Sequence, residues 1–350
     1  MSGRRPLGYD TGLVRSNQKV MSVGSNSVVV TFEADRDARA VFTECLGDIA
    51  DIAYLAELPE GERAGALRSA GIIIGRNTGK ELREGEDALI GNARLVQYVT
   101  AGVDYIPLRQ FPADLPIAAN GGAYAEPMAE HAVAMMFAAA KRLLVEHKKL
   151  ESGEFDQFRP NRMLAGATCG ILGFGGVGVA TARRMKALGL NVHAINRRGV
   201  ADEPIDWIGT ADQMDTLLAA ADVLVVVVPL LQNTECLIGA RELALMKPDA
   251  ILINLARGEI IDETALFRHL QANPAFVACI DAWWIEPVRH NRFAMGHPFL
   301  ELPNVIGSPH NSASIKGARA MAYRQAAANC RRVLDGKPAL HLIGPEGRMR

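Results

Sequence analysis

Short apolar runs rich in Val and Ile alternate along the chain with stretches of helical periodicity. This alternation is typical of parallel sheets whose strands are connected by helices. The first group of runs covers residues 28–32, 71–75, 95–99 and 116–119, with a weaker candidate at 52–55. The second group covers 168–174, 191–196, 223–229, 250–255, 276–282 and 304–307. The chain is therefore predicted to be an α/β protein with two doubly wound parallel sheets, the second a full six-stranded one.

Two long helical patterns flank the second group of runs. Residues 126–144 have Pro127 in the expected first helical turn and predict a buried helix that joins two domains. Residues 318–334 are also helical in pattern and are expected to return to the first domain. The predicted organisation is a domain of residues 1–120 plus 312–350, with residues 121–311 inserted as the other. The polar first 27 residues lack an apolar signal segment and predict a loose arm.

Composition removes several classes of protein. Of 350 residues, 49% are hydrophobic and 22% charged, and 38 Lys and Arg balance 39 Asp and Glu. A net charge of -1 gives no general attraction to nucleic acid or to anionic membranes, so we expect neither as a partner. The longest apolar runs have nine residues, about half the length of a membrane-spanning helix. The default expectation is a cytoplasmic protein.

Cysteine spacing and short motifs narrow the chemistry further. The five cysteines are far apart, and no Cys or His spacing suits a metal, so we predict no metal site. We interpret them as reduced core residues: Cys45, Cys169, Cys236, Cys279 and Cys330. HExxH, GxSxG and complete GxxxxGK[ST] strings are absent, which removes the usual support for a metalloprotease, a serine hydrolase or a P-loop nucleotidase.

A GxGxxG string follows the first strand of the second group and precedes a helical stretch at 179–188. Such glycines allow a tight turn and close backbone approach, and the helix N-terminus offers free N–H groups to a pyrophosphate. This context predicts a Rossmann dinucleotide-binding domain. A merely structural turn and an S-adenosylmethionine site are the alternatives. The cofactor-binding candidates here are Gly173, Gly175, Gly176, Val177 and Gly178.

The next strand ends at Asn196, followed by Arg197 and Arg198. An acidic residue at this point would bind a ribose 2′-hydroxyl, whereas a neutral residue with two guanidinium groups suits a 2′-phosphate. The sequence therefore favours NADP(H), with NAD(H) as the second choice. Two solvated surface arginines are the alternative interpretation.

Three later strands each end near one ionisable residue: Arg257, Glu286 and His310. Doubly wound sheets bind their ligands at strand ends, so these side chains form a workable set. The guanidinium can hold a carboxylate, the imidazole can exchange a proton, and the carboxylate can orient the imidazole. Spacing alone does not show convergence, and a surface ion pair, a helix cap and a structural histidine are the respective alternatives.

Several strings together resemble the D-2-hydroxyacid dehydrogenase family, which includes glyoxylate/hydroxypyruvate reductases and phosphoglycerate dehydrogenase. They are TAGVDYI at 100–106, AEHAVAMM at 129–136, NLARGEIIDETAL at 254–266, DAWWIEP at 281–287 and SPH at 308–310. The resemblance implies that a dinucleotide-binding domain is inserted into a flavodoxin-like substrate domain. It also implies that Arg257 binds the substrate, that His310 is the general acid/base, and that Glu286 is its partner.

The resemblance implies further contacts. Backbone amides around Ala101, Gly102 and Val103 would cradle the substrate carboxylate. The remaining expected cofactor contacts are Pro229, Thr234, Leu255, Ala256, Asp281 and Ser312. The chain departs from the family pattern in having Ser312 where a Gly is usual, and Gly176 where an Arg is frequent. We also expect a homodimer formed through the cofactor domain.

Other side chains near these strings leave alternatives open. Trp283 and Trp284 would either wall the substrate pocket or pack at a domain interface. His131 is expected to pack rather than to catalyse. Arg289, His290 and Arg292 would either lie in a solvated loop or reach a second acidic group on the substrate.

The leading function is hydride transfer between NADP(H) and a small 2-oxo or 2-hydroxy acid, with glyoxylate- or hydroxypyruvate-like substrates. The alternative is a corepressor-like binding protein that senses a nicotinamide cofactor on the same fold. An intact catalytic trio does not separate the two, although the absence of a basic nucleic-acid patch favours the enzyme.

Overall fold

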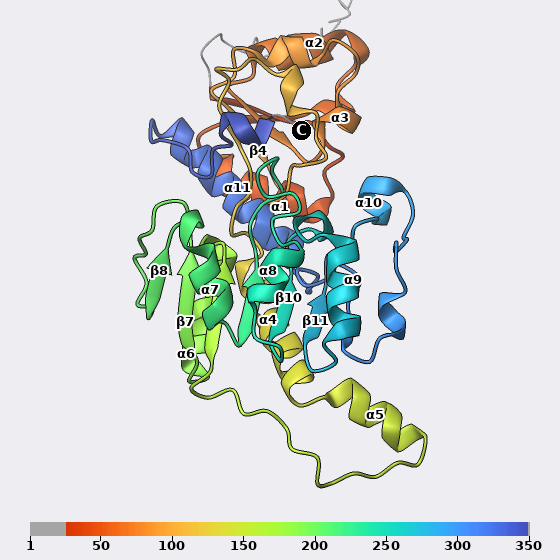
Figure 1. Ribbon diagram of the computed structural model, residues 1–350. Coiled ribbons are helices and arrows are strands. Elements are labelled where there is room, and N and C mark those ends of the chain that lie inside the picture. Colours follow the sequence, from red (N-terminus) through yellow and green to blue (C-terminus); the bar gives the residue numbers. More distant parts are fainter. Residues whose placement is uncertain (1–25, 349–350) are drawn as a thin grey trace, which may run out of the picture.

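Two parallel β-sheets, each flanked by helices, lie one above the other in the computed structural model (Figure 1), which describes residues 26–348. The predicted fold class of two doubly wound sheets is confirmed. The predicted loose arm lies outside the described residues except for its last two positions. Of these, Ser27 is already the first residue of a strand and is fully buried.

The first sheet has five strands in the order β2-β1-β3-β4-β5, all parallel, which is the flavodoxin-like order. Its strands are β1 Ser27–Val30, β2 Asp51–Tyr54, β3 Ile72–Gly75, β4 Leu95–Tyr98 and β5 Ile117–Ala118. Its helices are α1 Arg36–Leu46, α2 Glu60–Ser69 and α3 Thr78–Glu81. Every residue of β1, β3 and β4 is buried, because helices or loops cover both faces of this sheet.

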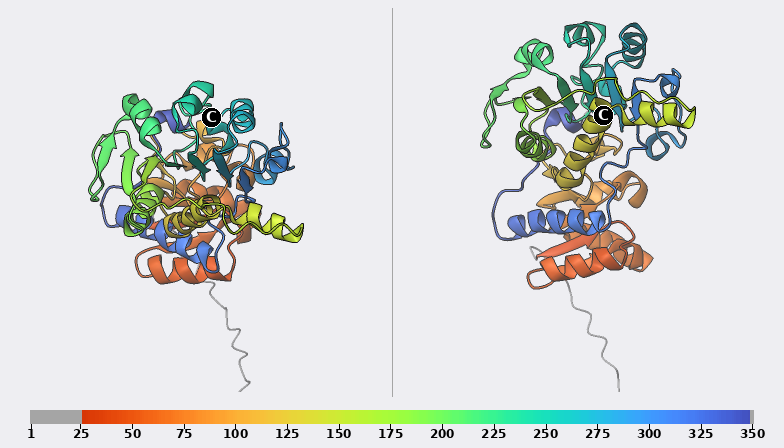
Figure 2. Two further views of the ribbon diagram at one scale, coloured as in Figure 1. Left: turned by 60° about the horizontal axis from the view of Figure 1, so that its bottom comes forward. Right: turned by 90° about the horizontal axis from the view of Figure 1, so that it is seen from below.

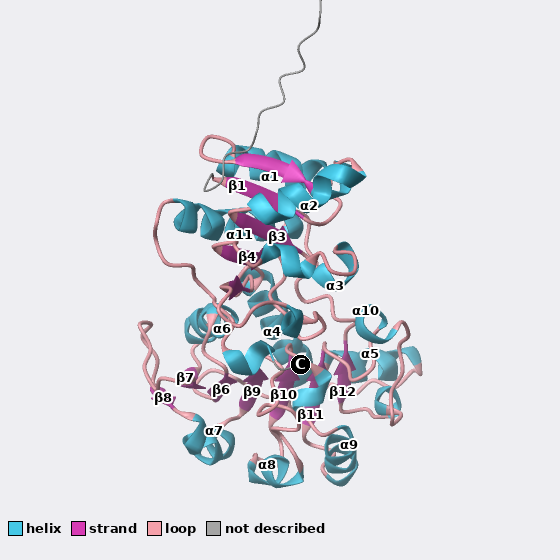
Figure 3. Ribbon diagram, turned by 90° about the horizontal axis from the view of Figure 1, so that it is seen from above, coloured by secondary structure: helices cyan, strands magenta, loops and turns pink. Residues whose placement is uncertain are grey.

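The second sheet has seven parallel strands in the order β12-β11-β10-β9-β6-β7-β8, visible as one row in Figure 3. They are β6 Thr168–Leu172, β7 Asn191–Ile195, β8 Trp207–Gly209, β9 Val223–Val226, β10 Ile251–Asn254, β11 Val277–Ile280 and β12 Val305–Gly307. The prediction of six strands is wrong, because β8 was missed. It is a three-residue edge strand, too short to produce a recognisable alternation.

Helices on both faces of this sheet complete the second half. They are α4 Ala125–Ala140, α5 Leu143–Glu151, α6 Gly176–Ala187, α7 Met214–Ala220, α8 Ala240–Leu245, α9 Glu263–Ala272 and α10 Pro287–His290. The single helix predicted over 126–144 is wrong in its extent. Arg142 has a left-handed backbone (φ 53°), which ends the first helix and redirects the chain into α5. Helix α4 packs against α6 and the sheet, whereas α5 has no buried residue and projects from the body (Figure 1).

Helix α11 (Ala318–Leu334) returns to the first sheet as predicted, where it packs against α1 and β4 (Figure 2). The chain then pairs with β5, since Ala119 N–H donates to His341 O and Ile343 N–H donates to Ile117 O. A last 3-10 turn, Pro345–Arg348, reaches back toward the second half of the molecule. The exact domain boundaries at residues 120 and 311 stay a prediction.

The cysteine interpretation holds only in part. All five are free thiols, and Cys169, Cys279 and Cys330 are buried, so that loss of water raises the pKa of each thiol. Cys45 is only half-buried and Cys236 is exposed, which contradicts the predicted core position. Cys236 lies in a turn with a left-handed backbone (φ 49°). Between residues 26 and 348, no helix has the length and apolar character needed to cross a membrane.

Candidate active site

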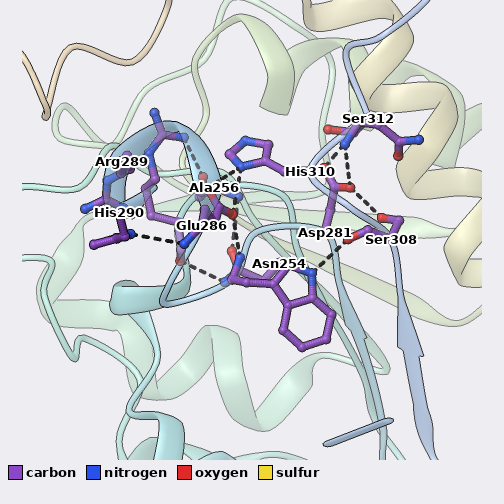
Figure 4. A network of polar contacts seen from close by, with 12 residues as sticks. Asn254, Ala256, Asp281, Glu286, Arg289, His290, Ser308, His310 and Ser312 are labelled. Atoms are coloured by element: carbon purple, nitrogen blue, oxygen red, sulfur yellow. Dashed lines mark hydrogen bonds and ion pairs between the residues drawn. The ribbon is translucent and has the colours of Figure 1, made fainter. Parts of the chain in front are cut away.

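Three neighbouring strands, β10, β11 and β12, end at the same edge of the second sheet, and their loops carry the predicted trio. Figure 4 labels two of the three, Glu286 and His310. Arg257 follows β10, Glu286 follows β11 and His310 follows β12. Strand ends at this edge are where such sheets bind ligands. The fold therefore brings together the three side chains that spacing alone left apart.

His310 and Glu286 form a tight pair. The Nδ1–H of His310 donates to both carboxylate oxygens of Glu286, each at 2.9 Å. Glu286 is nearly buried, and its Oε1 also accepts from the backbone N–H of Trp283 at 2.7 Å. Burial alone would raise the pKa of Glu286, but the hydrogen bond and charge of His310, the Trp283 N–H and the charge of Arg257 together lower it. Glu286 therefore stays ionised at neutral pH, and Nε2 of His310 is the ring nitrogen left to face a substrate.

Asp281, at the end of β11, holds the backbone on which His310 is mounted. Its side chain is completely buried and accepts from the hydroxyl of Ser308, from Asn311 N–H at 3.1 Å and from Ser312 N–H at 3.3 Å. His310 itself has a left-handed backbone (φ 50°), and its N–H donates to Asp281 O. The expected cofactor contacts Asp281 and Ser312 thus meet each other, and the side chain of Asp281 positions the loop that carries the imidazole.

Arg257 is positioned from two sides. Asn254, buried at the end of β10, donates to Arg257 O at 2.8 Å and accepts from Ala256 N–H at 3.1 Å. The Nη1 of Arg257 donates to Ala256 O at 2.7 Å. Its Nη2 donates to Asp104 Oδ1 at 2.9 Å, so a carboxylate from the loop after β4 of the other sheet reaches this guanidinium.

The predicted carboxylate cradle lies directly against Arg257. Among the hydrogen bonds of residues 26–348, the N–H groups of Ala101, Gly102 and Val103 donate to no protein acceptor. Free N–H groups in a turn form a concavity that suits an anion. A Cβ on Gly102 would overlap Nη2 of Arg257, so only glycine allows the guanidinium to approach this closely. Residues after β4 of the first sheet and after β10 of the second sheet therefore lie in direct contact at the position predicted to bind the carboxylate.

The glycine string suits a dinucleotide pyrophosphate. Helix α6 begins at Gly176 after β6, and no side chain caps its first N–H groups. A Cβ on Gly175 would meet nothing within 4 Å, so a ligand can approach the backbone there. A Cβ on Gly176 would lie 2.6 Å from the Cα of Gly122, which explains why this chain has no larger residue at that position.

The turn after β7, where the adenosine end of a cofactor is predicted, is exposed. The Oδ1 of Asn196 accepts from the N–H groups of Arg198 and Gly199, so its side chain shapes the turn after β7. The side chain of Arg197 is 89% exposed, and its Nη1 lies 3.3 Å from Glu346 Oε1 in the C-terminal turn. Both arginines lie where a 2′-phosphate is expected, but they are not fixed there by buried partners.

The remaining expected contacts lie along the same edge of the sheet. Thr234 closes the turn after β9 by donating to Pro229 O at 2.7 Å and accepting from Leu231 N–H. Leu255 and Ala256 are buried directly after β10. No three His, Cys, Asp or Glu side chains gather as a metal site would require within the described part of the chain.

Several open alternatives are decided by packing. Trp283 lies in the core of the second half and donates to Ser308 O, and Trp284 stacks on Phe299, so neither packs at an interface between the two halves. His131 Nε2 contacts Ser308 Oγ at 3.1 Å, a structural contact that ties α4 to the His310 loop.

The solvated-loop interpretation of the basic group is wrong for one of its three members, Arg289. Arg289 is 13% exposed and pairs with Glu259 and Asp104. His290 Nδ1 accepts the N–H of Glu286 at 3.0 Å, so its ring braces the start of α10. His290 and Arg292 are both exposed, as that interpretation expects.

Sequence reasoning missed three residues that shape the site: Asp104, Asn254 and Glu346. Asp104 lies within TAGVDYI and Asn254 is the polar last residue of a buried strand, so each carried a signal. Glu346 carried none, because its contact with Arg197 joins residues 149 positions apart.

Comparison with known proteins agrees with this geometry. A family model described as D-isomer specific 2-hydroxyacid dehydrogenase, NAD binding domain, matches residues 133–312. The chain is 30% identical over 270 residues to a glyoxylate reductase of Thermofilum pendens, covering 73% of this chain and 76% of that protein. It is 29% identical over 323 residues to a D-3-phosphoglycerate dehydrogenase of Methanocaldococcus jannaschii, covering 90% of this chain but 59% of that relative.

A solved structure shares the fold. It is a D-isomer specific 2-hydroxyacid dehydrogenase from Xanthobacter autotrophicus Py2 in complex with NADPH and MES. It matches with a TM-score of 0.74 and 24% identity, over 92% of this chain and 98% of that one.

Proposed function

Because the chain belongs to the D-isomer specific 2-hydroxyacid dehydrogenase family, we propose that it transfers hydride between NADP(H) and a small 2-oxo or 2-hydroxy acid. The observation that carries the proposal is the His310–Glu286 pair on the strand edge that also holds Arg257. Glyoxylate- or hydroxypyruvate-like acids are the proposed substrates. The compared relatives are named dehydrogenases and reductases, which gives the cofactor-sensing alternative no support.

The substrate carboxylate is held between the two halves of the molecule. The free N–H groups of residues 101–103 bind it from one side, and the guanidinium of Arg257 binds from the other. We infer that a carboxylate held there directs the carbonyl oxygen toward His310, the proposed proton donor. The bound nicotinamide supplies the hydride in reduction and accepts it in oxidation.

In this proposal His310 is the general acid in reduction and the general base in oxidation. Reduction of a carbonyl leaves an alkoxide, and Nε2 of a protonated His310 donates the proton to that oxygen. In the reverse direction Nε2 removes the hydroxyl proton. The ionised carboxylate of Glu286, at 2.9 Å from Nδ1, keeps the ring oriented. Asp281 holds the loop backbone, so that the ring meets the substrate in one orientation.

We propose a preference for NADP(H) over NAD(H). It is supported by the neutral Asn196 at the end of β7 and by Arg197 and Arg198, whose exposed side chains can close on a 2′-phosphate. The Xanthobacter relative in the comparison was crystallised with NADPH.

The test is consumption of NADPH and of NADH, followed at 340 nm, with a panel of 2-oxo acids that includes glyoxylate and hydroxypyruvate. We expect steady turnover with NADPH and a lower KM for NADPH than for NADH. Cofactor binding without turnover of any 2-oxo acid would refute the enzymatic proposal and revive the sensing alternative.

We propose the cytoplasm as the compartment of this protein, because its five cysteines are free thiols and a reducing compartment keeps thiols free. We further propose that two copies pair through α5 and the segment after it. This projecting region exposes large apolar side chains that the protomer leaves uncovered: Leu143, Leu144, Leu150, Phe155, Phe158 and Met163. Light scattering should give a dimer mass. Phe155→Ser with Phe158→Ser should shift it to a monomer, and a monomeric parent protein would disprove the pairing.

A further inference from the structure

Asp104 is a buried carboxylate that comes from the substrate half and holds the predicted substrate anchor of the cofactor half. Its side chain is 6% exposed, and that of Arg257 is 17% exposed. Oδ1 accepts from Nη2 of Arg257 at 2.9 Å, and both oxygens lie within 3.3 Å of Nε. Burial alone would raise the pKa of Asp104, but Arg257 and Arg289 together lower it. The carboxylate is therefore charged at neutral pH and grips one edge of the guanidinium.

The remaining donors of Arg257 can be counted. A guanidinium has five N–H groups. Asp104 uses the Nε–H and one N–H of Nη2, and Ala256 O uses one N–H of Nη1. One N–H of Nη1 and one of Nη2 are left for a ligand. Two donors on one planar group suit a carboxylate, or a carboxylate oxygen together with a neighbouring carbonyl oxygen.

Arg289 balances the charge that Asp104 brings. Its Nε lies 3.5 Å from Asp104 Oδ2, and its Nη1 donates to Glu259 Oε2 at 3.0 Å. Arg257 and Arg289 thus face Asp104 and Glu259, two positive charges against two negative ones. Without Arg289, a bound substrate carboxylate would share a single guanidinium with Asp104, and the two anions would repel each other. Because its donors are committed to these partners, Arg289 serves the anchor and does not reach a second acidic group on the substrate.

We propose that Asp104 is a positioning residue that fixes Arg257 with two donors turned to the substrate, and that Arg289 makes this arrangement tolerable for an anionic ligand. This inference rests on the proposed function. It assigns to the substrate half a part in aligning the carbonyl with His310, beyond the backbone amides of residues 101–103. Asp104 acts only when the two halves are together, because its partners belong to the other sheet.

The experiment compares Asp104→Asn with the parent enzyme by steady-state kinetics on glyoxylate. Asparagine keeps the shape but removes the charge, so the loss of one charge-assisted hydrogen bond should lower kcat/KM for the 2-oxo acid by about tenfold or more. Both a lower kcat and a higher KM for the acid are expected, with the KM for NADPH unchanged. Arg289→Gln, which leaves the Asp104–Arg257 pair in place, should raise the KM for the acid several-fold and change kcat less.

Asp222→Asn is the matched control. Asp222 is also a largely buried carboxylate that pairs with two cations, Arg162 and Lys247, but it precedes β9 at the opposite edge of the sheet. This variant should lower the melting temperature and leave kcat and both KM values as they are. If Asp104→Asn behaves like the control, its role is structural and the inference is wrong.

Two further outcomes separate the remaining possibilities. A lower KM for the acid with an unchanged kcat in Asp104→Asn would identify Asp104 as a competitor of the substrate, which overturns the proposal. A parent enzyme that reduces no 2-oxo acid would refute the proposed function instead. In that case, oxamate binding to the NADPH complex, followed by fluorescence, still tests Asp104: weaker binding by the variant supports the inference, and equal binding contradicts it.

Discussion

The two ends of the proposed cofactor site are built in opposite ways. At the catalytic end, Glu286 is 8% exposed and Asp281 is fully buried, and each makes several hydrogen bonds before any ligand binds. At the adenosine end, Arg197 is 89% exposed and has one ion pair with the C-terminal turn. Exposed ion pairs contribute about 0 to 1 kcal/mol, so this end is held only loosely.

Under the proposed function, this difference separates the residues that transfer the proton from those that discriminate between the two cofactors. A general acid has to meet its substrate within a few tenths of an ångström, and the buried network around His310 provides that precision in advance. A 2′-phosphate brings its own charge and can order two exposed guanidinium groups when it arrives. Substitutions at the catalytic end should therefore cost far more activity than substitutions at the adenosine end.

The largest effect is expected from His310→Ala. Without its imidazole no positioned group protonates the alkoxide, so kcat should fall by about 100- to 10,000-fold at every pH tested. Reduction of glyoxylate with NADPH measures the loss. His193→Ala, which removes a half-buried ring on β7 away from the site, is the control and should keep the parent rate. Near-parent turnover by the His310 variant would remove this residue from the mechanism.

Arg257→Lys should rank second. An ammonium cannot present two parallel donors while also holding Asp104, so kcat/KM for the 2-oxo acid should fall by about tenfold to a hundredfold, the value of one or more charge-assisted hydrogen bonds. Cofactor affinity, measured by NADPH fluorescence, should stay close to that of the parent. Arg162→Lys provides a control at the opposite edge of the sheet. A fully active Arg257→Lys enzyme would place carboxylate recognition elsewhere.

Glu286→Gln should change the pH dependence more than the maximal rate. Because the pKa of Glu286 is lowered, its carboxylate is ionised throughout the assay range, and the substitution removes one negative charge beside Nδ1 of His310. Removing a negative charge next to a proton donor makes the protonated donor less favourable, so the basic limb of the reduction profile should move to lower pH. Profiles of kcat between pH 5 and 9 measure this, and superimposable profiles would exclude Glu286 from the role.

The smallest effect is expected from replacing Arg197 and Arg198 together by Ala. The preference for NADPH over NADH, measured as the ratio of kcat/KM values, should fall by about tenfold, with the loss confined to NADPH and greatest at low salt. Arg183→Ala is a matched control, since Arg183 is an exposed arginine on α6 that pairs with Glu203. If the ratio of kcat/KM for NADPH to that for NADH does not change in the double variant, the assignment of the 2′-phosphate site is wrong.

Much of the fold was readable because its strands are buried on both faces. Such strands appear as continuous runs of Val and Ile. All ten strands predicted from these runs exist, as does the weaker candidate at residues 52–55. The failures lie where burial is partial or local conformation intervenes. The edge strand β8 is too short to recognise, and one left-handed residue, Arg142, divides a helix whose composition suggested continuity.

The local sequence was sufficient to predict which residue types the candidate site contains and after which strands they lie. Motif order identified the family, and the position of each ionisable residue after a buried strand indicated Arg257, Glu286 and His310. What remained open was every relation between segments distant in the chain. The contact of Asp104 with Arg257 spans 153 positions, and that of Arg197 with Glu346 spans 149. Such contacts depend on how two independently wound sheets face each other. That arrangement results from the packing of whole surfaces, and no local run of residues encodes it.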